Sequence, residues 1–249
     1  MKFLKKILAI IFPSHCLSCE KIISGEGVFC SHCWQKLQFI TEPKCKICCH
    51  PFEFKVTDEM LCAPCLTNPP AYDKALTVFA YNQIIKKIIG KFKYNDATFT
   101  AKKLAPFLLN KVRHELNEID LIVAVPLHKK RLRLRKFNQS LLLCRAMLQQ
   151  VPTIKFPVCP VEIKFYPDFL LRIKNTKAQV ELRRKQRKKN LNSAFAVNKK
   201  YFQSLAGKRI LLVDDVITTG ATLNNCAKVL KKMGAQKVIV LTVAKTVFR

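Results

Sequence analysis

Beyond residue 74, short continuous apolar runs alternate with stretches in which apolar positions recur every three or four residues. Such runs are typical of strands buried on both faces of a parallel sheet, and the helical spacing is typical of helices that cover it. The predicted strands are residues 75–81, 121–125, 210–213 and 238–243. The predicted helices are residues 82–91, 101–116 and 223–233. This alternation predicts an α/β fold with a mostly parallel sheet, whose ligands bind at the carboxyl ends of the strands.

The first part of the chain lacks this pattern and is rich in cysteine instead. Nine of the twelve cysteines lie between Cys16 and Cys65. The Thr-Asn-Pro-Pro sequence at residues 67–70 then interrupts any regular structure. We therefore expect a basic amphipathic segment at residues 1–12, a metal-binding module at residues 13–68 and an α/β domain at residues 69–249.

Eight of these cysteines form four Cys-x-x-Cys pairs. The pairs are Cys16 and Cys19, Cys30 and Cys33, Cys45 and Cys48, and Cys62 and Cys65. Eight thiolates are ligands for two tetrahedral Zn²⁺ ions, so we predict two structural zinc sites. A redox function needs one reactive pair and does not account for four. Sequential pairing and an interleaved cross-brace both fit the spacing, and we expect the neighbouring Cys49, His15, His32 and His50 not to be ligands.

Residues 1–12 combine lysines with an apolar run and are similar to the start of a secretory signal. The run is too short to span a bilayer and leads into Cys16 without a small-residue cleavage site. We therefore expect a cytoplasmic protein whose thiols stay reduced. The segment either packs against the rest of the chain or lies as an amphipathic helix on the anionic inner face of the cell membrane.

The composition adds a strong positive charge, because 45 Lys and Arg residues and 16 Asp and Glu residues give a formal net charge of +29. Such a surface favours polyanionic partners, although a generally basic composition is the alternative explanation. Residues 129–136 and 172–190 concentrate the charge and predict electrostatic binding of single-stranded DNA with little sequence specificity. The candidate nucleic-acid contacts are Lys129, Lys130, Lys136, Arg172, Lys174, Arg183, Arg184, Lys185 and Arg187.

The predicted strand at residues 210–213 delivers Asp214 and Asp215 to its carboxyl end, and a Thr-Thr-Gly-Ala-Thr turn follows at residues 218–222. Small residues, hydroxyls and the amides at the start of the next helix form a cradle for phosphate. Two carboxylates beside a phosphate repel it unless they face sugar hydroxyls or a cation. The motif therefore predicts a phosphorylated sugar bound with Mg²⁺.

At these residues the chain resembles the type I phosphoribosyltransferases, whose motif is a strand, two acids and a Thr-Thr-Gly loop. Further motifs are similar to those of the ComF competence family, which joins a double zinc ribbon to a phosphoribosyltransferase domain. They are Tyr72-Asp73, Lys93-Tyr94, Val125-Pro126-Leu127-His128 with Arg131, Arg135-Lys136-Phe137-Asn138-Gln139-Ser140, Thr176 with Gln179, and Arg187 to Asn190 with Ala194-Phe195. Nearly the whole chain is covered. Lys136 departs from the family, which usually has a Gly there, and Gly tolerates positive φ where Lys does not.

The resemblance implies a binding site for 5-phosphoribosyl pyrophosphate. The residues implied to hold the 5-phosphate are Thr218, Thr219, Gly220, Ala221 and Thr222. Asp214 and Asp215 are implied to hold the ribose hydroxyls, with Mg²⁺ bridging ribose and pyrophosphate. They are also the candidate catalytic carboxylates, because phosphoribosyl transfer develops positive charge at the anomeric carbon. The residues implied to surround the pyrophosphate are Val125, Pro126, Leu127, His128, Lys93, Arg131 and Arg135.

Three functional hypotheses follow. The resemblance implies a competence factor that handles incoming single-stranded DNA in natural transformation and carries a Mg²⁺-dependent phosphoribosyl pyrophosphate site. The first alternative is a phosphoribosyltransferase that acts on a nucleobase-like acceptor. The second is a membrane-associated adaptor that contacts DNA uptake or recombination proteins.

Overall fold

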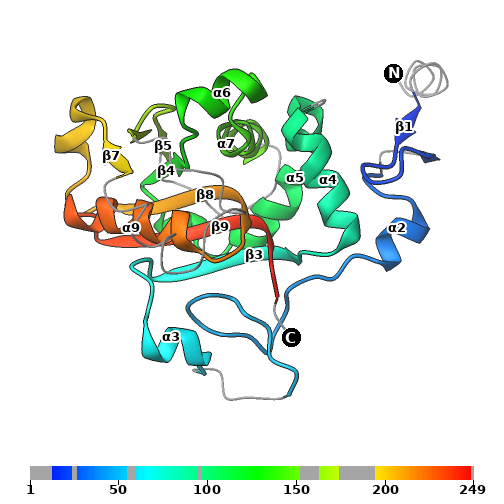
Figure 1. The fold of residues 1–249 in the computed structure, drawn as a ribbon, viewed down its shortest axis with the longest axis horizontal. Coiled ribbons are helices and arrows are strands. Elements are labelled where there is room, and N and C mark those ends of the chain that lie inside the picture. Colours follow the sequence, from blue (N-terminus) through cyan, green and yellow to red (C-terminus); the bar gives the residue numbers. More distant parts are fainter. Residues whose placement is uncertain are drawn as a thin grey trace.

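The computed structural model describes residues 13–23, 27–54, 60–94, 97–151, 163–173 and 194–247. The N-terminal segment that we expect to be amphipathic, residues 1–12, lies outside these ranges. Figure 1 shows a central sheet covered by helices, with two cysteine-rich loops attached to it. One loop lies beside α4 and carries β1 and α2. The other lies below β3 and carries α3.

The central sheet has five strands, and all of its pairings are parallel. In spatial order the strands are β3 (Lys74–Ala80), β9 (Lys237–Lys245), β8 (Arg209–Ile217), β4 (Leu121–Ala124) and β5 (Lys164–Phe165). The four predicted strands are therefore confirmed as β3, β4, β8 and β9, in one parallel sheet.

Helices cover both faces of this sheet. In β8, Leu211 and Val213 belong to the core formed with α4 (Gln83–Tyr94), α5 (Ala97–Val112) and α7 (Gln139–Gln150). Ile210 and Leu212 belong to the core formed with α9 (Ala221–Lys232). Successive side chains of a strand point to opposite faces, so a continuous apolar run supplies both cores.

The remaining elements are short and lie around the sheet. They are β1 (Ser14–His15), β2 (Ile22–Ile23), α2 (Ser31–Gln35), α3 (Ala63–Thr67), the 3₁₀ helix η1 (Leu116–Glu118), α6 (Lys129–Arg135), β6 (Leu170–Arg172), β7 (Phe195–Val197) and the 3₁₀ helix η4 (Lys199–Ser204). Strands β1 and β2 form one antiparallel pair, and β6 and β7 form another. The sequence patterns did not predict α6, α7 or the β6–β7 pair.

Several predicted boundaries are wrong by a few residues, and two of them change the packing or the site. Helix α5 ends at Val112, and a turn followed by η1 buries Leu116 in place of a helix that was expected to reach residue 116. Strand β8 does not end before the acids but includes Asp214 and Asp215. The reason lies in its neighbour β9, which pairs with β8 from Arg209 as far as Ile217.

The other neighbour of β8 is shorter. Strand β4 ends at Ala124, which pairs with Val213. Beyond this point the two acids of β8 have a partner strand on one side only. The open side is where the candidate site forms.

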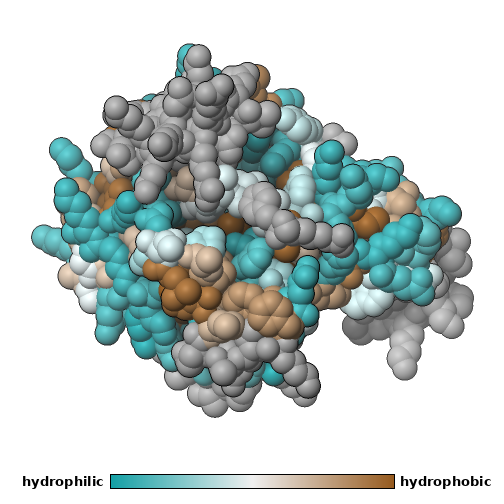
Figure 2. Space-filling view, turned by 60° about the horizontal axis from the view of Figure 1, so that its bottom comes forward, coloured by the Kyte–Doolittle hydropathy of each residue, from teal (hydrophilic) through white to brown (hydrophobic). Residues whose placement is uncertain are grey.

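None of the helices in the described part of the chain is long and apolar enough to cross a membrane. Figure 2 shows hydrophilic side chains over much of the face in view, and the largest group of apolar side chains lies just below its centre.

Candidate functional site

The eight predicted zinc ligands form two groups in space. One group is Cys16, Cys19, Cys30 and Cys33, and the other is Cys45, Cys48, Cys62 and Cys65. Within each group the sulfur atoms lie within 4.8 Å of one another. The pairing is therefore sequential, and the interleaved cross-brace is wrong.

The geometry of each group fits a tetrahedral ion. Sγ atoms of Cys19 and Cys30 are 3.7 Å apart, and those of Cys48 and Cys62 are 3.5 Å apart. A Zn–S bond of about 2.3 Å places the sulfurs of a tetrahedron about 3.8 Å apart. Cysteine alone completes both groups among the described residues, so His15, His32, His50 and Cys49 are not needed as ligands. The two sites are thus consistent with two structural zinc ions. We name them the first tetrad, which begins at Cys16, and the second tetrad, which begins at Cys45.

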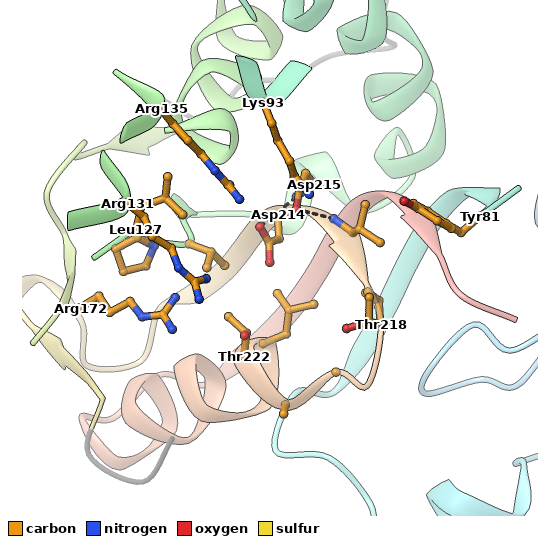
Figure 3. Close-up of a pocket in the computed structure, with 17 residues that line it drawn as sticks. Tyr81, Lys93, Leu127, Arg131, Arg135, Arg172, Asp214, Asp215, Thr218 and Thr222 are labelled. Atoms are coloured by element: carbon orange, nitrogen blue, oxygen red, sulfur yellow. Dashed lines mark hydrogen bonds and ion pairs between the residues drawn. The ribbon is translucent and has the colours of Figure 1, made fainter. Parts of the chain in front are cut away.

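A cavity of about 280 Å³ opens at the carboxyl ends of the strands, on the open side of β8. Its lining combines the end of β8, the loop after β4, helix α6 and the first turn of α9. The lining residues are Tyr81, Lys93, Val125, Pro126, Leu127, Arg131, Arg135, Arg172, Asp214, Asp215, Val216, Ile217, Thr218, Gly220, Ala221, Thr222 and Leu223. Figure 3 shows Asp214 between the arginine side chains and the loop that carries Thr218 and Thr222.

The two carboxylates have different surroundings. Asp214 Oδ1 accepts hydrogen bonds from Ser140 Oγ and from the Asp215 backbone N–H, each at 2.9 Å. Asp215 pairs with Lys93, whose Nζ lies 3.4 Å from Oδ2. Burial, and then the negative charge of Asp215, raise the pKa of Asp214 to about 7. A carboxyl that is shielded from solvent and lies beside a second carboxylate keeps its proton up to a pH near neutral.

Three arginines form the opposite wall of the cavity. Arg131 and Arg135 come from α6, and Arg172 comes from β6. Burial and the neighbouring guanidinium groups lower the pKa of both Arg131 and Arg172. The guanidinium of Arg172 also lies over the Phe195 ring, 5.3 Å from its centroid. Clustered, partly buried cations of this kind favour a multiply charged anion.

Local hydrogen bonds hold the loop after β4 and the helix that follows it. The side chain of His128 caps α6, because Nδ1 accepts from the Lys130 backbone N–H at 3.2 Å. Asn138 caps α7 and donates from Nδ2 to the Val125 carbonyl at 3.0 Å. Lys136 ends α6 in the left-handed region, with φ of 64°. The loop thus keeps a positive φ at the position where the family usually has Gly, and Lys136 adopts it at the cost of steric strain.

The loop after β8 has the form predicted for a phosphate cradle. Gly220, with φ of 72°, caps the N-terminus of α9, and helix α9 begins at Ala221. Thr219 Oγ1 accepts from the Ala221 backbone N–H at 3.4 Å. Thr218 and Thr222 face the cavity (Figure 3), so both hydroxyls and the helix amides are directed to the same space.

The structure brings most of the predicted binding residues together but not all of them. Thr219 and His128 do not line the cavity. The Thr219 side chain accepts from the Ala221 backbone N–H, and that of His128 caps α6. Arg172, predicted as a nucleic-acid contact, lies in the cavity wall. Tyr81, at the end of β3, was missed, although the rule that ligands bind at strand carboxyl ends points to it.

The other predicted nucleic-acid contacts fall into two sets. Lys129, Lys130 and Lys136 are exposed on and beside α6. The remaining candidates, Lys174, Arg183, Arg184, Lys185 and Arg187, lie outside the described residues.

Two cysteine tetrads followed by a parallel α/β domain with this cavity define a double zinc ribbon joined to a phosphoribosyltransferase-type domain. Comparison with known families supports both parts. Residues 7–66 match the family described as double zinc ribbon domain, and residues 165–246 match the phosphoribosyl transferase domain.

The chain belongs to the ComF family of competence proteins. It is 30% identical to competence protein F of Haemophilus influenzae, over 92% of this chain and 90% of that relative. It is 32% identical to DNA utilization protein YhgH of Escherichia coli, over 74% and 78%. It is 27% identical to competence protein ComFC of Bacillus subtilis, over 86% and 82%.

A solved structure with similarity to the chain is an allosteric regulatory enzyme of purine biosynthesis. The identity is 17%, over 57% of this chain and 25% of that one, with a TM-score of 0.34. This similarity is too low to carry an argument about function.

Proposed function

We propose that the cavity binds 5-phosphoribosyl pyrophosphate with Mg²⁺, and that the protein handles single-stranded DNA during DNA uptake. One observation carries the first part. We call the loop at residues 218–222 the phosphate-type loop. This loop, a pair of carboxylates and a group of three arginines meet in one cavity in that order. A sugar with a phosphate at one end and a pyrophosphate at the other has the complementary order of groups.

Each wall of the cavity then has a role. The loop at residues 218–222 and the N-terminus of α9 hold the 5-phosphate. Asp214 and Asp215 accept hydrogen bonds from the ribose hydroxyls. Arg131, Arg135 and Arg172 neutralise the pyrophosphate, which would otherwise not enter beside two carboxylates.

The donor set also suits a magnesium ion. Carboxylate and phosphate oxygens are ligands that Mg²⁺ prefers, and the ion commonly binds through one or two carboxylates and the oxygens of its phosphate ligand. The ion, when bound, neutralises charge on the pyrophosphate. Asp214 and Asp215, which line the cavity, are the residues that would hold it.

The test is the thermal stability of the protein with and without the ligand. A ligand that binds only the native state stabilises it, so phosphoribosyl pyrophosphate with Mg²⁺ should raise Tm by several degrees at about 100 times Kd, where the added stability is about 2.7 kcal/mol. Asp215→Asn should lose most of the shift, whereas Asp168→Asn should keep it, because Asp168 does not line the cavity. Absence of a shift in the wild type at millimolar ligand would contradict the proposal.

The DNA part of the proposal rests on the relatives and on charge. Relatives named competence proteins and a DNA utilization protein cover most of the chain. Lys129, Lys130 and Lys136 are exposed on a chain with net charge +29. Exposed cations on one short helix displace counterions from a phosphate backbone, so binding should weaken steeply with salt.

A second candidate function is phosphoribosyl transfer to an acceptor. The aromatic side chain of Tyr81 favours it, because this ring lines the same cavity on the side away from the arginines. An acceptor ring stacked there would face the ribose. Release of pyrophosphate from phosphoribosyl pyrophosphate in the presence of nucleobases, and its loss in Tyr81→Ala, would identify this activity.

A further inference from the structure

The segment that leaves the second tetrad runs along helix α9, whose first turn forms the phosphate-type loop. We call this segment, residues 68–73, the strap. It begins three residues after the metal ligand Cys65 and one residue after the end of α3. It ends where β3 starts.

The strap contacts α9 at both ends of the helix. In the first turn, Asn224 Oδ1 accepts a hydrogen bond from the Ala71 backbone N–H at 2.7 Å. In the last turn, Lys231 Nζ pairs with Asp73 at 2.7 Å. Asp73 also accepts from the Val238 backbone N–H at 2.6 Å, which joins the strap to the start of β9.

Tyr72, between Ala71 and Asp73 in the strap, lies beside the phosphate-type loop. Its side chain is only 5% exposed, and it does not line the cavity. A Cβ atom placed on Gly220 would lie 3.8 Å from the Tyr72 hydroxyl, in van der Waals contact. The Tyr72 hydroxyl therefore lies beside Gly220, the residue that caps α9 and closes the phosphate-type loop.

The second tetrad is linked to the cluster that contains Tyr72 by Ile47, which packs against both of them. The carbonyl of Ile47, between Cys45 and Cys48, accepts from the Ala75 backbone N–H at 2.7 Å. The segment from Cys45 to Cys48 is thus fixed to the start of β3, and the strap is held at both of its ends.

The first tetrad has no comparable connection among the described residues. Its loop contacts α4 through an ion pair, with Lys91 Nζ 2.7 Å from Glu20. It also makes apolar contacts, because Leu17 belongs to the core formed with α4 and α5 and the Phe29 and Phe107 ring centroids are 5.9 Å apart. Helix α4 also carries Lys93, which faces the cavity. None of these contacts involves a residue of the phosphate-type loop or of α9.

We propose that the second zinc site, acting through the strap and Tyr72, positions the phosphate-type loop, and that the first zinc site does not. The inference rests on the proposed function, since it assigns the 5-phosphate to that loop. Tyr72 is then a positioning residue. Loss of the second metal should weaken binding of the 5-phosphate and leave the arginine wall intact.

Two matched cysteine variants test this in the full-length protein. Cys33 and Cys65 are buried and occupy equivalent positions in the short helices α2 and α3. Titration calorimetry with ribose 5-phosphate reports on the loop, and titration with Mg²⁺ and inorganic pyrophosphate reports on the arginine wall. Cys65→Ser should weaken ribose 5-phosphate by about ten-fold and pyrophosphate by less than about two-fold, whereas Cys33→Ser should change neither beyond about two-fold. Equal effects of the two variants on ribose 5-phosphate would overturn the inference.

Substitution of Tyr72 tests the same connection with both metal sites intact. Tyr72→Ala should weaken binding of ribose 5-phosphate by about ten-fold. Tyr72→Phe keeps the buried ring and loses only the hydroxyl beside Gly220, so it should weaken binding by no more than about three-fold. Pyrophosphate affinity should not change in either variant. Unchanged ribose 5-phosphate affinity in Tyr72→Ala, or equal loss of both ligands, would contradict the positioning role.

Hydrogen exchange separates failure of this inference from failure of the proposed function. Amides at residues 218–226 should exchange faster in Cys65→Ser than in Cys33→Ser, whether or not any ligand binds. If the wild type binds neither ligand but this difference in exchange is present, the proposed ligand is wrong, and the positioning of the loop by the strap still holds. Equal exchange at these amides in the two variants would show that the strap does not position the loop.

Discussion

Replacement of Asp214 by Asn should make the unliganded protein more stable and at the same time remove its binding of phosphoribosyl pyrophosphate. The carboxyl has a raised pKa, about 7 compared with 3.8, because of burial and the charge of Asp215. Its two hydrogen bonds, from Ser140 and from the backbone of Asp215, both end on Oδ1, and an amide oxygen at that position can also accept both. The substitution therefore removes the charge and preserves the contacts.

The expected gain follows from the pKa. The folded protein holds the Asp214 proton more tightly than the unfolded chain between pH values of about 4 and 7, so stability falls as the pH rises through that window. At 1.36 kcal/mol per pKa unit, the destabilisation at pH 8 is about 4 kcal/mol, and partial exposure to solvent reduces it to about 2 kcal/mol. Asp214→Asn should recover about this amount at pH 8 and progressively less toward pH 5, where the wild-type carboxyl carries its proton.

Urea unfolding followed by circular dichroism, with zinc present and at several pH values, measures the difference. Asp120→Asn is a matched control for which we expect the opposite change in the free energy of unfolding. Burial opposes ionisation of Asp120, but hydrogen bonds from the backbone and side chain of Arg209 hold the pKa of that carboxyl below its usual range. This control should lose about 1 kcal/mol. The reasoning is refuted if Asp214→Asn is no more stable than the wild type at pH 8 while Asp120→Asn behaves as expected.

Three further predictions concern the metal sites, the strained loop and the basic helix. Metal analysis of the purified protein should find about two zinc ions per chain, and chelation should unfold residues 13–68 while circular dichroism still shows the α/β domain; a zinc-free folded protein would contradict this. Lys136→Gly should stabilise the protein by about 0.5–1 kcal/mol in urea unfolding because it relieves the positive φ, and Lys136→Ala, which keeps the strain, should not. Exchange of Lys129, Lys130 and Lys136 together for Glu should weaken labelled single-stranded oligonucleotides of any sequence, and the slope of log affinity against log salt should flatten by about three. Indifference of DNA affinity to this exchange would remove α6 from the DNA surface.

The sheet could be predicted from the sequence, because strands buried on both faces leave continuous apolar runs. The position of the acids could be predicted only approximately. Whether Asp214 and Asp215 follow a strand or lie within it depends on the lengths of its neighbours. Strand β9 pairs with β8 beyond the acids, whereas β4 stops at Ala124. The run of apolar residues in β8 contains no information about either neighbour.

Arg172 shows a second limit of sequence reasoning. Its strand, β6, has three residues and pairs with β7, more than twenty positions further along the chain. A segment this short has no measurable periodicity, and its charged residue is indistinguishable in the sequence from the basic stretch that follows. The arginine wall therefore became visible only when α6 and β6 were placed side by side. The cysteine ligands could be predicted from the sequence, since each Cys-x-x-Cys pair is local and its spacing alone identifies it.

Helix α6 connects the two parts of the proposed function. Arg131 and Arg135, four positions apart and therefore on one face of the helix, line the cavity, while Lys129 and Lys130 are exposed. The cavity and the proposed DNA surface thus share one helix of seven residues. A pyrophosphate group held by Arg131 and Arg135 neutralises positive charge within a Debye length, about 10 Å, of the lysines on the other face. If both sites are used as proposed, the bound metabolite weakens the attraction of α6 for DNA, and this coupling should disappear as salt screens the charges.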